Sequence, residues 1–347
     1  MIYVLDGFDI VDCIETKRSV IWNVQYTGFS EFELVIPGTD ENIDKITAGR
    51  YLLRAEDKTD GKYENVMLIE KINLSFSEDD GWLLTVSGEG LKALLKRRVI
   101  WTQTNIEDTV ENGIRTLINE NVISPSESAR KIDDFILDTA VGLTDEFETQ
   151  VFGENLGEYI KETCETYNYG WDIYINNRKY VFRLFTGTDR HSTVTFSRDY
   201  DNLQDTEYEY TLEEYKNAAL VGGEGEGTDQ RYASIGTATG LDRYEAYIDG
   251  SDVSSNGEII TLDTYIELLK EHGKQELAQT SITQTLSGEV VPNGMFKLNV
   301  DYFLGDIVHI KAEKGISANA RISEIIYSED ENGVLITPTF SNWEVEA

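Results

Sequence analysis

The chain has 347 residues, of which 64 are acidic and 30 are basic, so its formal net charge is −34. The length favours roughly two to three domains, and an apolar content of 40% with four prolines indicates folded material and excludes a disordered chain. Because affinity for a nucleic-acid backbone comes largely from Lys and Arg, so acidic a chain is not expected to bind DNA as its ordinary partner.

The first ninety or so residues have the pattern of an antiparallel β-sheet. Phe32, Leu34 and Ile36 alternate with other residues at the period of a half-buried strand, after a turn at Gly28 and before a stop at Pro37. The leucines and basic residues that follow predict a short amphipathic helix over residues 91–99, which closes a small barrel or sandwich. Further strands are predicted at residues 51–54, 66–76 and 82–87.

From residue 102 to about 196 the pattern changes to α/β. Apolar residues at helical spacing predict one helix over 106–118, with Asn105 as its cap, and a second over 156–167, with Asn155 as its cap and a stop at Gly170. The segment 124–150 is polar and is expected to be rich in loops. Two strands are predicted at 171–175 and 180–185, joined by a turn at Asn176 and Asn177, a residue type that tolerates left-handed backbone.

The next segment contains a strand at 218–221 and a run of glycines from Gly222 to Gly227. A phosphate cradle needs backbone amides and a cation, and here Glu224 and Glu226 alternate with the glycines, so a nucleotide site is excluded and a flexible scaffold turn is favoured. A linker at 251–257 and a helix at 261–280, which Gly273 interrupts or kinks, lead into a second β domain. Its strands are predicted at residues 280–286, 307–311, 320–328 and 334–340.

No arrangement of residues in the sequence predicts catalysis. His191, His272 and His309 lack a neighbouring Cys or His at ligand spacing, and no carboxylate pair stands in a distinctively apolar setting. Cys13 and Cys164 are far apart and are expected to be free thiols of a protein made in a reducing cytoplasm. We therefore predict a protein without catalytic, cofactor-binding or metal-binding residues, which lacks a signal peptide and does not insert into a membrane.

Three polar clusters each have two interpretations. The basic run Lys96-Arg97-Arg98 favours pairing with neighbouring carboxylates, and an anion site is the alternative. Residues 199–202 read Asp-Tyr-Asp-Asn and favour a turn over a cation loop, since the glycine and terminal Glu of a calcium loop are missing. Asp189-Arg190-His191 favours a polar loop in which Arg190 pairs with an acid, with acid–base chemistry as the alternative.

The aromatic residues also permit two functions. Nineteen Tyr and five Trp could stack on sugars, as in a module that binds polysaccharide of a cell wall. Most of these rings lie within strand patterns, where packing in a core or at a protein interface is commoner.

The order of several short motifs resembles the siphophage tail-protein family typified by the actinophage ReqiPepy, which is similar to the baseplate hub or tail-associated protein of tailed phages. Further agreement lies at Ile21-Trp22, residues 32–37, residues 90–101 and residues 302–308, so the resemblance spans nearly the whole chain. The ordered motifs are Phe196-Ser197-x-x-Tyr200-x-Asn202-Leu203, Tyr215-Lys216-Asn217-x-x-x-Val221-x-Gly223-Glu224-Gly225 and Gly240-Leu241-x-Arg243-x-Glu245.

The resemblance implies a β-rich α+β fold with two small tail-tube-like β-barrel domains and an inserted α/β domain. The expected division is a first barrel at 1–101, the insertion at 102–197, a return to the first barrel with a connector at 198–250, and a second barrel with its helix at 251–347. None of the matched positions carries chemistry. The resemblance thus implies assembly, and the end of the chain at Ala347, without an added module, favours a hub over a lysin or adhesin.

The implied function is that of a structural hub, not an enzyme, at the tip of a phage or prophage tail, made in the bacterial cytoplasm. Three copies would form a ring that contacts the tube or distal-tail protein on one side and a spike, fibre or tape-measure protein on the other, with DNA passing through without specific binding. The acidity serves either solubility or a DNA-repelling channel. A carbohydrate-binding adhesin and a glycoside or peptidoglycan hydrolase are the alternative functions.

Overall fold

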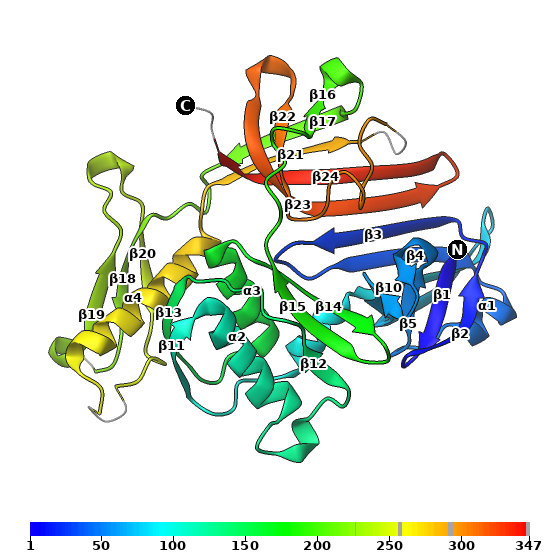
Figure 1. The fold of residues 1–347 in the computed structure, drawn as a ribbon. Helices are drawn as coiled ribbons and strands as arrows, with labels where there is room; N and C mark the ends of the chain where they lie inside the picture. Colours follow the sequence, from blue (N-terminus) through cyan, green and yellow to red (C-terminus); the bar gives the residue numbers. More distant parts are fainter. Residues whose placement is uncertain (226, 256–258, 291–293, 345–347) are drawn as a thin grey trace.

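The computed structural model describes residues 1–225, 227–255, 259–290 and 294–344. Its largest feature is a sheet of ten strands that contains both N-terminal and C-terminal strands (Figure 1). Along its main path the strands are β17 (Gln204–Thr211), β21 (Thr283–Glu289), β24 (Gly333–Glu344), β23 (Ser317–Asp330), β3 (Ser19–Gln25), β4 (Glu31–Pro37), β10 (Gly81–Glu89) and β9 (Lys71–Ser77), and β22 (Ile307–Lys311) with β16 (Thr195–Ser197) branches from β23.

The two ends of the chain are joined by antiparallel pairing of β23 with β3, from Glu324 opposite Gln25 to Glu329 opposite Val20. Edge-to-edge pairing extends a sheet and does not close it. The two predicted β-barrels are not confirmed: the described residues form a β-rich α+β fold of several sheets without a closed barrel, because the N-terminal and C-terminal strands share one sheet.

The N-terminal half of this sheet is covered by a second sheet of four strands. The buried side chains between the two layers include Trp22, Phe32 and Leu34, so the predicted alternation at 31–36 is confirmed. The predicted strand at 66–76 is divided in two, since β8 ends before Ile69 and β9 begins in the other sheet. The covering strands are β2 (Asp9–Ile14), β1 (Ile2–Asp6), β5 (Tyr51–Arg54) and β8 (Met67–Leu68), and a short helix α1 (Asp40–Lys45) with Thr39 as its cap lies beside them.

The segment 102–197 contains helices and strands in the predicted α/β order, but its last strand, β16, belongs to the large sheet. Asn155 caps the second helix as predicted, and the hairpin turn has left-handed backbone at Asn177 and Arg178. The cap expected at Asn105 is wrong, because residues 104–109 extend as a strand and Thr109 caps the first helix. The elements are β11 (Thr104–Thr109), α2 (Val110–Ile118), β12 (Phe135–Leu137), β13 (Glu146–Val151), α3 (Leu156–Tyr167), β14 (Gly170–Asn176) and β15 (Tyr180–Phe185), with β6 (Lys58–Thr59) and β7 (Lys62–Tyr63) extending the sheet of β14.

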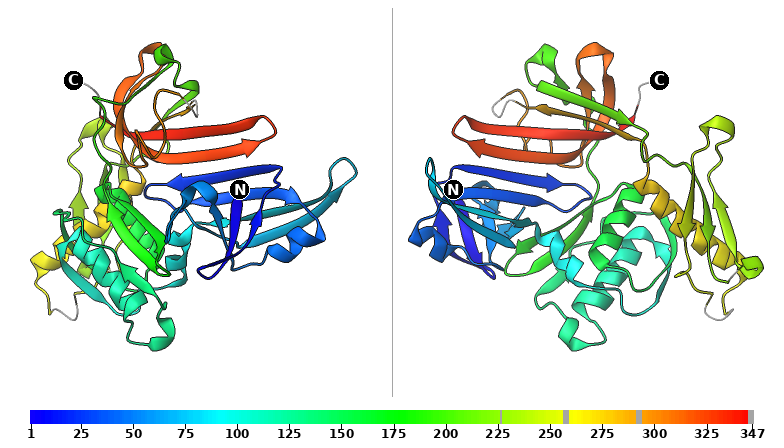
Figure 2. Two further views of the ribbon diagram at one scale, coloured as in Figure 1. Left: turned by 45° about the vertical axis from the view of Figure 1, so that its right-hand side comes forward. Right: turned by 180° about the vertical axis from the view of Figure 1, so that it is seen from behind.

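A smaller unit of three strands and the longest helix lies at one side of the molecule (Figures 1 and 2). The predicted strand at 218–221 exists as β18, but it pairs with β19 and β20, so its expected return to the first barrel is wrong. Gly273 does not break the helix, and a Cβ there would lie 2.6 Å from the Val221 side chain, so the glycine permits close packing on β18. The elements are β18 (Ala218–Gly222), β19 (Tyr232–Ile235), β20 (Glu245–Asp249) and α4 (Leu262–Gln279).

The other C-terminal strands confirm the sequence prediction, with β21, β22, β23 and β24 near the expected positions. The predicted linker at 251–257 lies partly outside the described residues. None of the described helices has the length and apolar character needed to cross a membrane.

Candidate functional site

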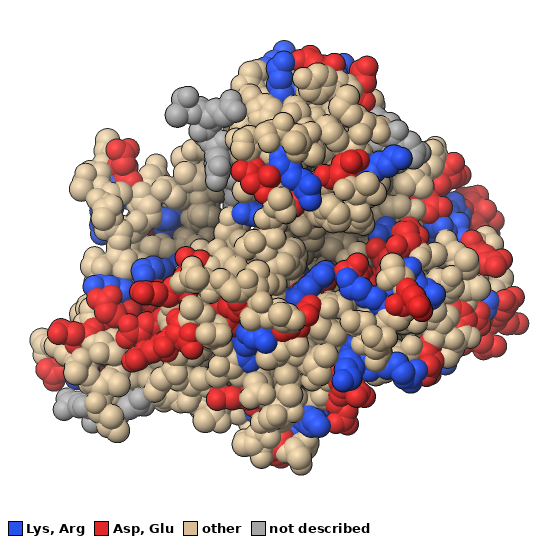
Figure 3. Space-filling model, viewed as in Figure 1, with Lys and Arg blue, Asp and Glu red and all other residues tan. Residues whose placement is uncertain are grey.

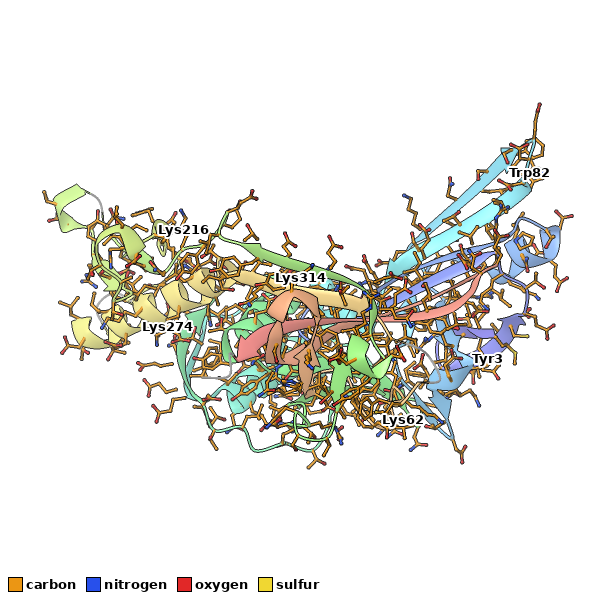
Figure 4. The ribbon with its side chains drawn as sticks, turned by 90° about the horizontal axis from the view of Figure 1, so that it is seen from above. Tyr3, Lys62, Trp82, Lys216, Lys274 and Lys314 are labelled. Atoms are coloured by element: carbon orange, nitrogen blue, oxygen red, sulfur yellow. The ribbon has the colours of Figure 1, made fainter. Side chains whose placement is uncertain are left out.

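The large sheet has one apolar face, which the rest of the chain covers, and one polar face. Side chains alternate between the faces of a strand, so strand register assigns each residue to a face. Figure 4, seen from above, shows the other elements gathered on one side of these strands. The polar face carries Ser19, Asn23, Gln25, Glu31, Glu33, Lys71, Asn73, Ser75, Thr85, Ser87, Glu89, Glu207, Glu209, Thr283, Thr285, Ser287, Glu324, Ser328, Thr337 and Thr339, with Ile21, Val35, Leu83, Ile326 and Leu335 among them.

The ionisable groups on this polar face are mainly carboxylates. Glu31 and Glu33 on β4 are exposed, as are Glu207 and Glu209 on β17, at the other end of the sheet. Lys71 on β9 is the basic residue among these positions. The face therefore presents hydroxyl, amide and carboxylate groups with Ile21 and Leu335 exposed among them, and its carboxylates repel the phosphates of DNA.

Glu324 joins the strands at the centre of this face. One of its carboxylate oxygens accepts hydrogen bonds from the side-chain amides of Asn23 at 2.7 Å and Gln25 at 3.3 Å, and the other accepts from the Thr339 hydroxyl at 2.9 Å. These partners lie on β3 and β24, the neighbours of β23. The polar face is thus bonded across the junction between the N-terminal and C-terminal strands.

Both ends of the sheet are open within the described part of the chain. All of β9 is exposed, and its hairpin with β10 extends away from the body to Trp82 (Figures 2 and 4). On the apolar side of this hairpin Leu74 is 44% exposed and Phe76 is 60% exposed, with the Phe76 ring 5.3 Å from that of Trp82. At the opposite end, β17 exposes Tyr208 and Tyr210 on the same side. Unpaired strand edges beside exposed apolar side chains are typical of protein interfaces.

The basic run is mainly paired, and its first residue, Lys96, reaches Glu89 of the polar face. Lys96 Nζ lies 2.5 Å from Glu89 and 3.9 Å from Glu158, and Arg97 lies 3.9 Å from Glu70, which confirms the predicted pairing for these two residues. The guanidinium of Arg98 instead donates to the carbonyl oxygen of Arg130 at 2.9 Å. Burial, followed by the charge of Arg130, lowers the pKa of Arg98.

The two polar loops have the predicted structural roles. Arg190 Nε donates to the buried carboxylate of Asp306 at 2.6 Å. At the turn of residues 199–202, Asn202 accepts from the backbone N–H of Ser197 at 2.7 Å and donates to the carbonyl of Thr195 at 2.9 Å. Both segments therefore close turns beside the C-terminal strands.

The glycine run serves close packing. A Cβ on Gly223 would lie 2.3 Å from the Tyr265 hydroxyl, and Gly225 has a φ of +98°. Glu224 accepts a hydrogen bond from the backbone N–H of Ser255 at 2.8 Å. Glu226 lies outside the described residues, and the remainder confirms a scaffold turn beneath α4.

Both cysteines are free, and burial raises the pKa of the Cys164 thiol. The described residues contain no group of three or more His, Cys, Asp or Glu side chains placed to hold a metal ion. The absence of catalytic and cofactor residues stays a prediction.

Lys92 is a residue whose role the sequence did not reveal. Its spacing placed it on the polar side of a helix, yet it is buried in a 3-10 helix (Leu91–Arg97). Its Nζ donates to the carbonyl oxygens of Gln25 at 2.7 Å and Gly28 at 2.8 Å, and burial lowers its pKa to about 8. Lys92 thereby fixes the turn between β3 and β4.

The family model of the siphovirus ReqiPepy6 Gp37-like protein matches residues 1–341. The chain belongs to this family. It is a family of phage tail proteins, as the order of the sequence motifs implied. A comparison with curated protein sequences gives no match.

Solved structures of phage tail proteins share the fold. The 43 kDa tail protein of prophage MuSo2 from Shewanella oneidensis aligns with a TM-score of 0.61 at 15% identity, covering 98% of this chain and 97% of that chain. A tail protein from Neisseria meningitidis MC58 aligns with a TM-score of 0.59 at 15% identity, covering 98% and 96%. The prophage tail protein gp18 from Listeria monocytogenes EGD-e aligns with a TM-score of 0.50 at 13% identity, covering 98% and 94%. At these identities the likeness concerns the fold.

Proposed function

We propose that this tail protein is a structural hub, not an enzyme, in which three copies form a ring at the tail tip and the polar sheet face lines a DNA channel. The observation that carries the proposal is one sheet with two open ends and an uncovered polar face that is continuous across the N-terminal and C-terminal strands. Pairing of β9 of one copy with β17 of the next would continue the sheet from copy to copy. Closed symmetry then ends the assembly as a ring.

The dimensions of such a ring suit a channel. The main path of the sheet has eight strands, so three copies supply 3 × 8 = 24. With strands about 4.8 Å apart and tilted by up to about 40°, a closed sheet of this size is about 35–50 Å across at the backbone. Side chains reduce the inner diameter of the channel to about 25 Å or more. On each side they project inward by roughly 5 Å, which is half the distance between packed sheets. A DNA duplex could pass.

The electrostatics of the polar face fit passage without binding. Exposed carboxylates such as Glu31 and Glu209 would repel phosphates, and the neutral hydroxyl and amide groups between them offer no strong anion site. In this interpretation, part of the net charge of −34 lines the channel, and the remaining acidic residues keep the protein soluble.

The proposed location is the virion tail. The tube or distal-tail protein would bind one rim of the ring and a spike, fibre or tape-measure protein the other. We further propose that residues 102–197 act as a domain inserted between the N-terminal strands, residues 1–101, and the C-terminal strands. This domain would carry surfaces for these partners outside the channel.

The ring is tested by light scattering at high protein concentration in moderate salt, because screening reduces repulsion between copies. The expected result is a trimer. Leu74→Glu should return the protein to monomer, since it places a charge at the β9 edge, and Leu220→Glu should leave the trimer intact, since Leu220 is equally exposed, at 45%, but lies on the three-stranded sheet.

A stable dimer, a ring of six copies of this chain, or equal effects of the two substitutions would contradict the proposal. Labelling of the chain in intact tails provides the second test, and a position away from the tip would exclude the hub role.

A further inference from the structure

A cleft of about 610 Å³ is lined by residues between 22 and 65, between 171 and 190, and between 298 and 327. Its walls come from β3, β23, the segment 54–65, the hairpin of β14 and β15, the connector at 186–190 and the loop at 298–306. Figure 3 shows a hollow in this part of the face, and in Figure 4 the lining residue Lys62 lies on the side away from Trp82. The volume is that of an ordinary small-ligand site.

The cations of the cleft are each paired with a carboxylate, and a fifth carboxylate, Glu56, lies 3.8 Å from Arg54 and is half exposed. Arg54 Nε lies 2.6 Å from Asp57, and Lys62 Nζ lies 2.8 Å from Glu64. Arg183 lies 3.0 Å from Asp172. The Arg190–Asp306 pair completes the set. A ligand with a net charge would have to break one of these pairs, so the cleft favours a neutral ligand.

Hydrogen-bonding capacity remains after this pairing. It lies in exposed neutral side chains, since the Nε of Arg183, which has no acceptor among the described residues, is buried and out of reach of a ligand. Thr186, Thr188 and Asn299 line the cleft and are exposed, and each adds a group that donates and accepts. An aliphatic ligand would leave these groups unpaired at a cost, whereas hydroxyl groups would satisfy them.

Aromatic rings supply the apolar part of the wall. Phe185, Phe303 and Tyr327 line the cleft, and Phe303 is 38% exposed. A guanidinium lies against each ring, at 5.4 Å for Arg183 over Phe185, 5.4 Å for Arg190 over Phe303 and 4.5 Å for Arg54 over Tyr327. Rigid rings beside planar hydrogen-bonding groups match the apolar face and the hydroxyl rim of a sugar.

We propose that this cleft binds a short neutral saccharide, with the C–H face of a sugar on Phe303 and its hydroxyl groups bonded to the exposed side chains of Thr186, Thr188 and Asn299. The site does not depend on ring formation. In the proposed ring it would lie outside the channel, because the cleft and the polar face occupy different sides of the large sheet.

Saturation-transfer NMR and calorimetry on the full chain, at concentrations where it is monomeric, test the site. The probes are chitotriose, cellotriose and maltotriose, with trigalacturonate as the charged comparison. We expect saturable binding of at least one neutral trisaccharide and none of trigalacturonate. Phe303→Ala should weaken binding about tenfold or more, and Asn299→Ala should weaken it because an exposed amide that bonds the sugar is removed.

Phe152→Ala is the matched control, since Phe152 is 56% exposed but lies outside the cleft, and it should bind as the parent does. Circular dichroism confirms that each variant is folded. Lack of binding to all three neutral probes, binding that is unchanged in Phe303→Ala, or preference for trigalacturonate or an apolar peptide would each overturn the proposal. None of these results bears on the trimer, which is measured separately.

Discussion

Replacing Asp306 by Ala should strongly destabilise the junction between residues 102–197 and the C-terminal strands. The Asp306 side chain is 3% exposed and accepts three hydrogen bonds, from the Thr188 N–H at 2.7 Å, the Phe303 N–H at 2.9 Å and Arg190 Nε at 2.6 Å. The two bonds from backbone N–H groups to a carboxylate contribute about 1.5 kcal/mol each. The ion pair adds about 1 kcal/mol, because Arg190 is partly solvated.

The expected loss is therefore about 4 kcal/mol of unfolding free energy, within the range of about 3–5 kcal/mol for breaking a buried pair. Urea denaturation followed by circular dichroism measures it. Asp199→Ala is the matched control: its carboxylate also pairs at 2.6 Å, with Lys311, but is 67% exposed, so the unfolding midpoint should hardly move. A loss below about 1 kcal/mol for Asp306→Ala, or equal losses for both variants, would refute the reasoning that burial sets the value of this pair.

Four further results are expected. Duplex DNA should not associate with the protein at low salt, and a salt-sensitive complex at micromolar protein would exclude the repulsive channel. Pure protein should leave peptidoglycan intact, and release of wall fragments that one Asp or Glu substitution abolishes would show an enzyme. Burial raises the pKa of Tyr159 to about 12, which favours the neutral phenol in the folded state. The free energy of unfolding should therefore keep its full value below pH 10 and fall between about pH 10 and 12. This fall should be smaller in Tyr159→Phe. Limited proteolysis should cut 124–150 first, and early cleavage at 66–76 would contradict the predicted domain division.

Local structure was predictable where neighbours in sequence decide it. Asn155 precedes an apolar helical stripe and accepts from the N–H groups of Gly157 and Glu158, which requires no distant residue. The alternation at Phe32, Leu34 and Ile36 likewise reports burial of one strand face. The prediction of a helix cap at Asn105 was wrong because Ile106 fits both a helical stripe and the alternation of β11. Pairing of this segment with β13 stabilises the strand.

The sequence by itself therefore determined most strands and helices, the family and the excess of acid, since these depend on residue type and spacing. Tertiary structure alone decided which strands became neighbours. The pairing of β23 with β3 joins residues some 300 positions apart, as in the Asn23–Glu324 hydrogen bond, and nothing in either strand's own pattern specifies that partner. That pairing converted two expected barrels into one open sheet, created its continuous polar face, and brought Arg183, Arg54 and Phe303 to a common cleft. Local propensity cannot encode such contacts, because their energy comes from groups that meet only after the chain has folded.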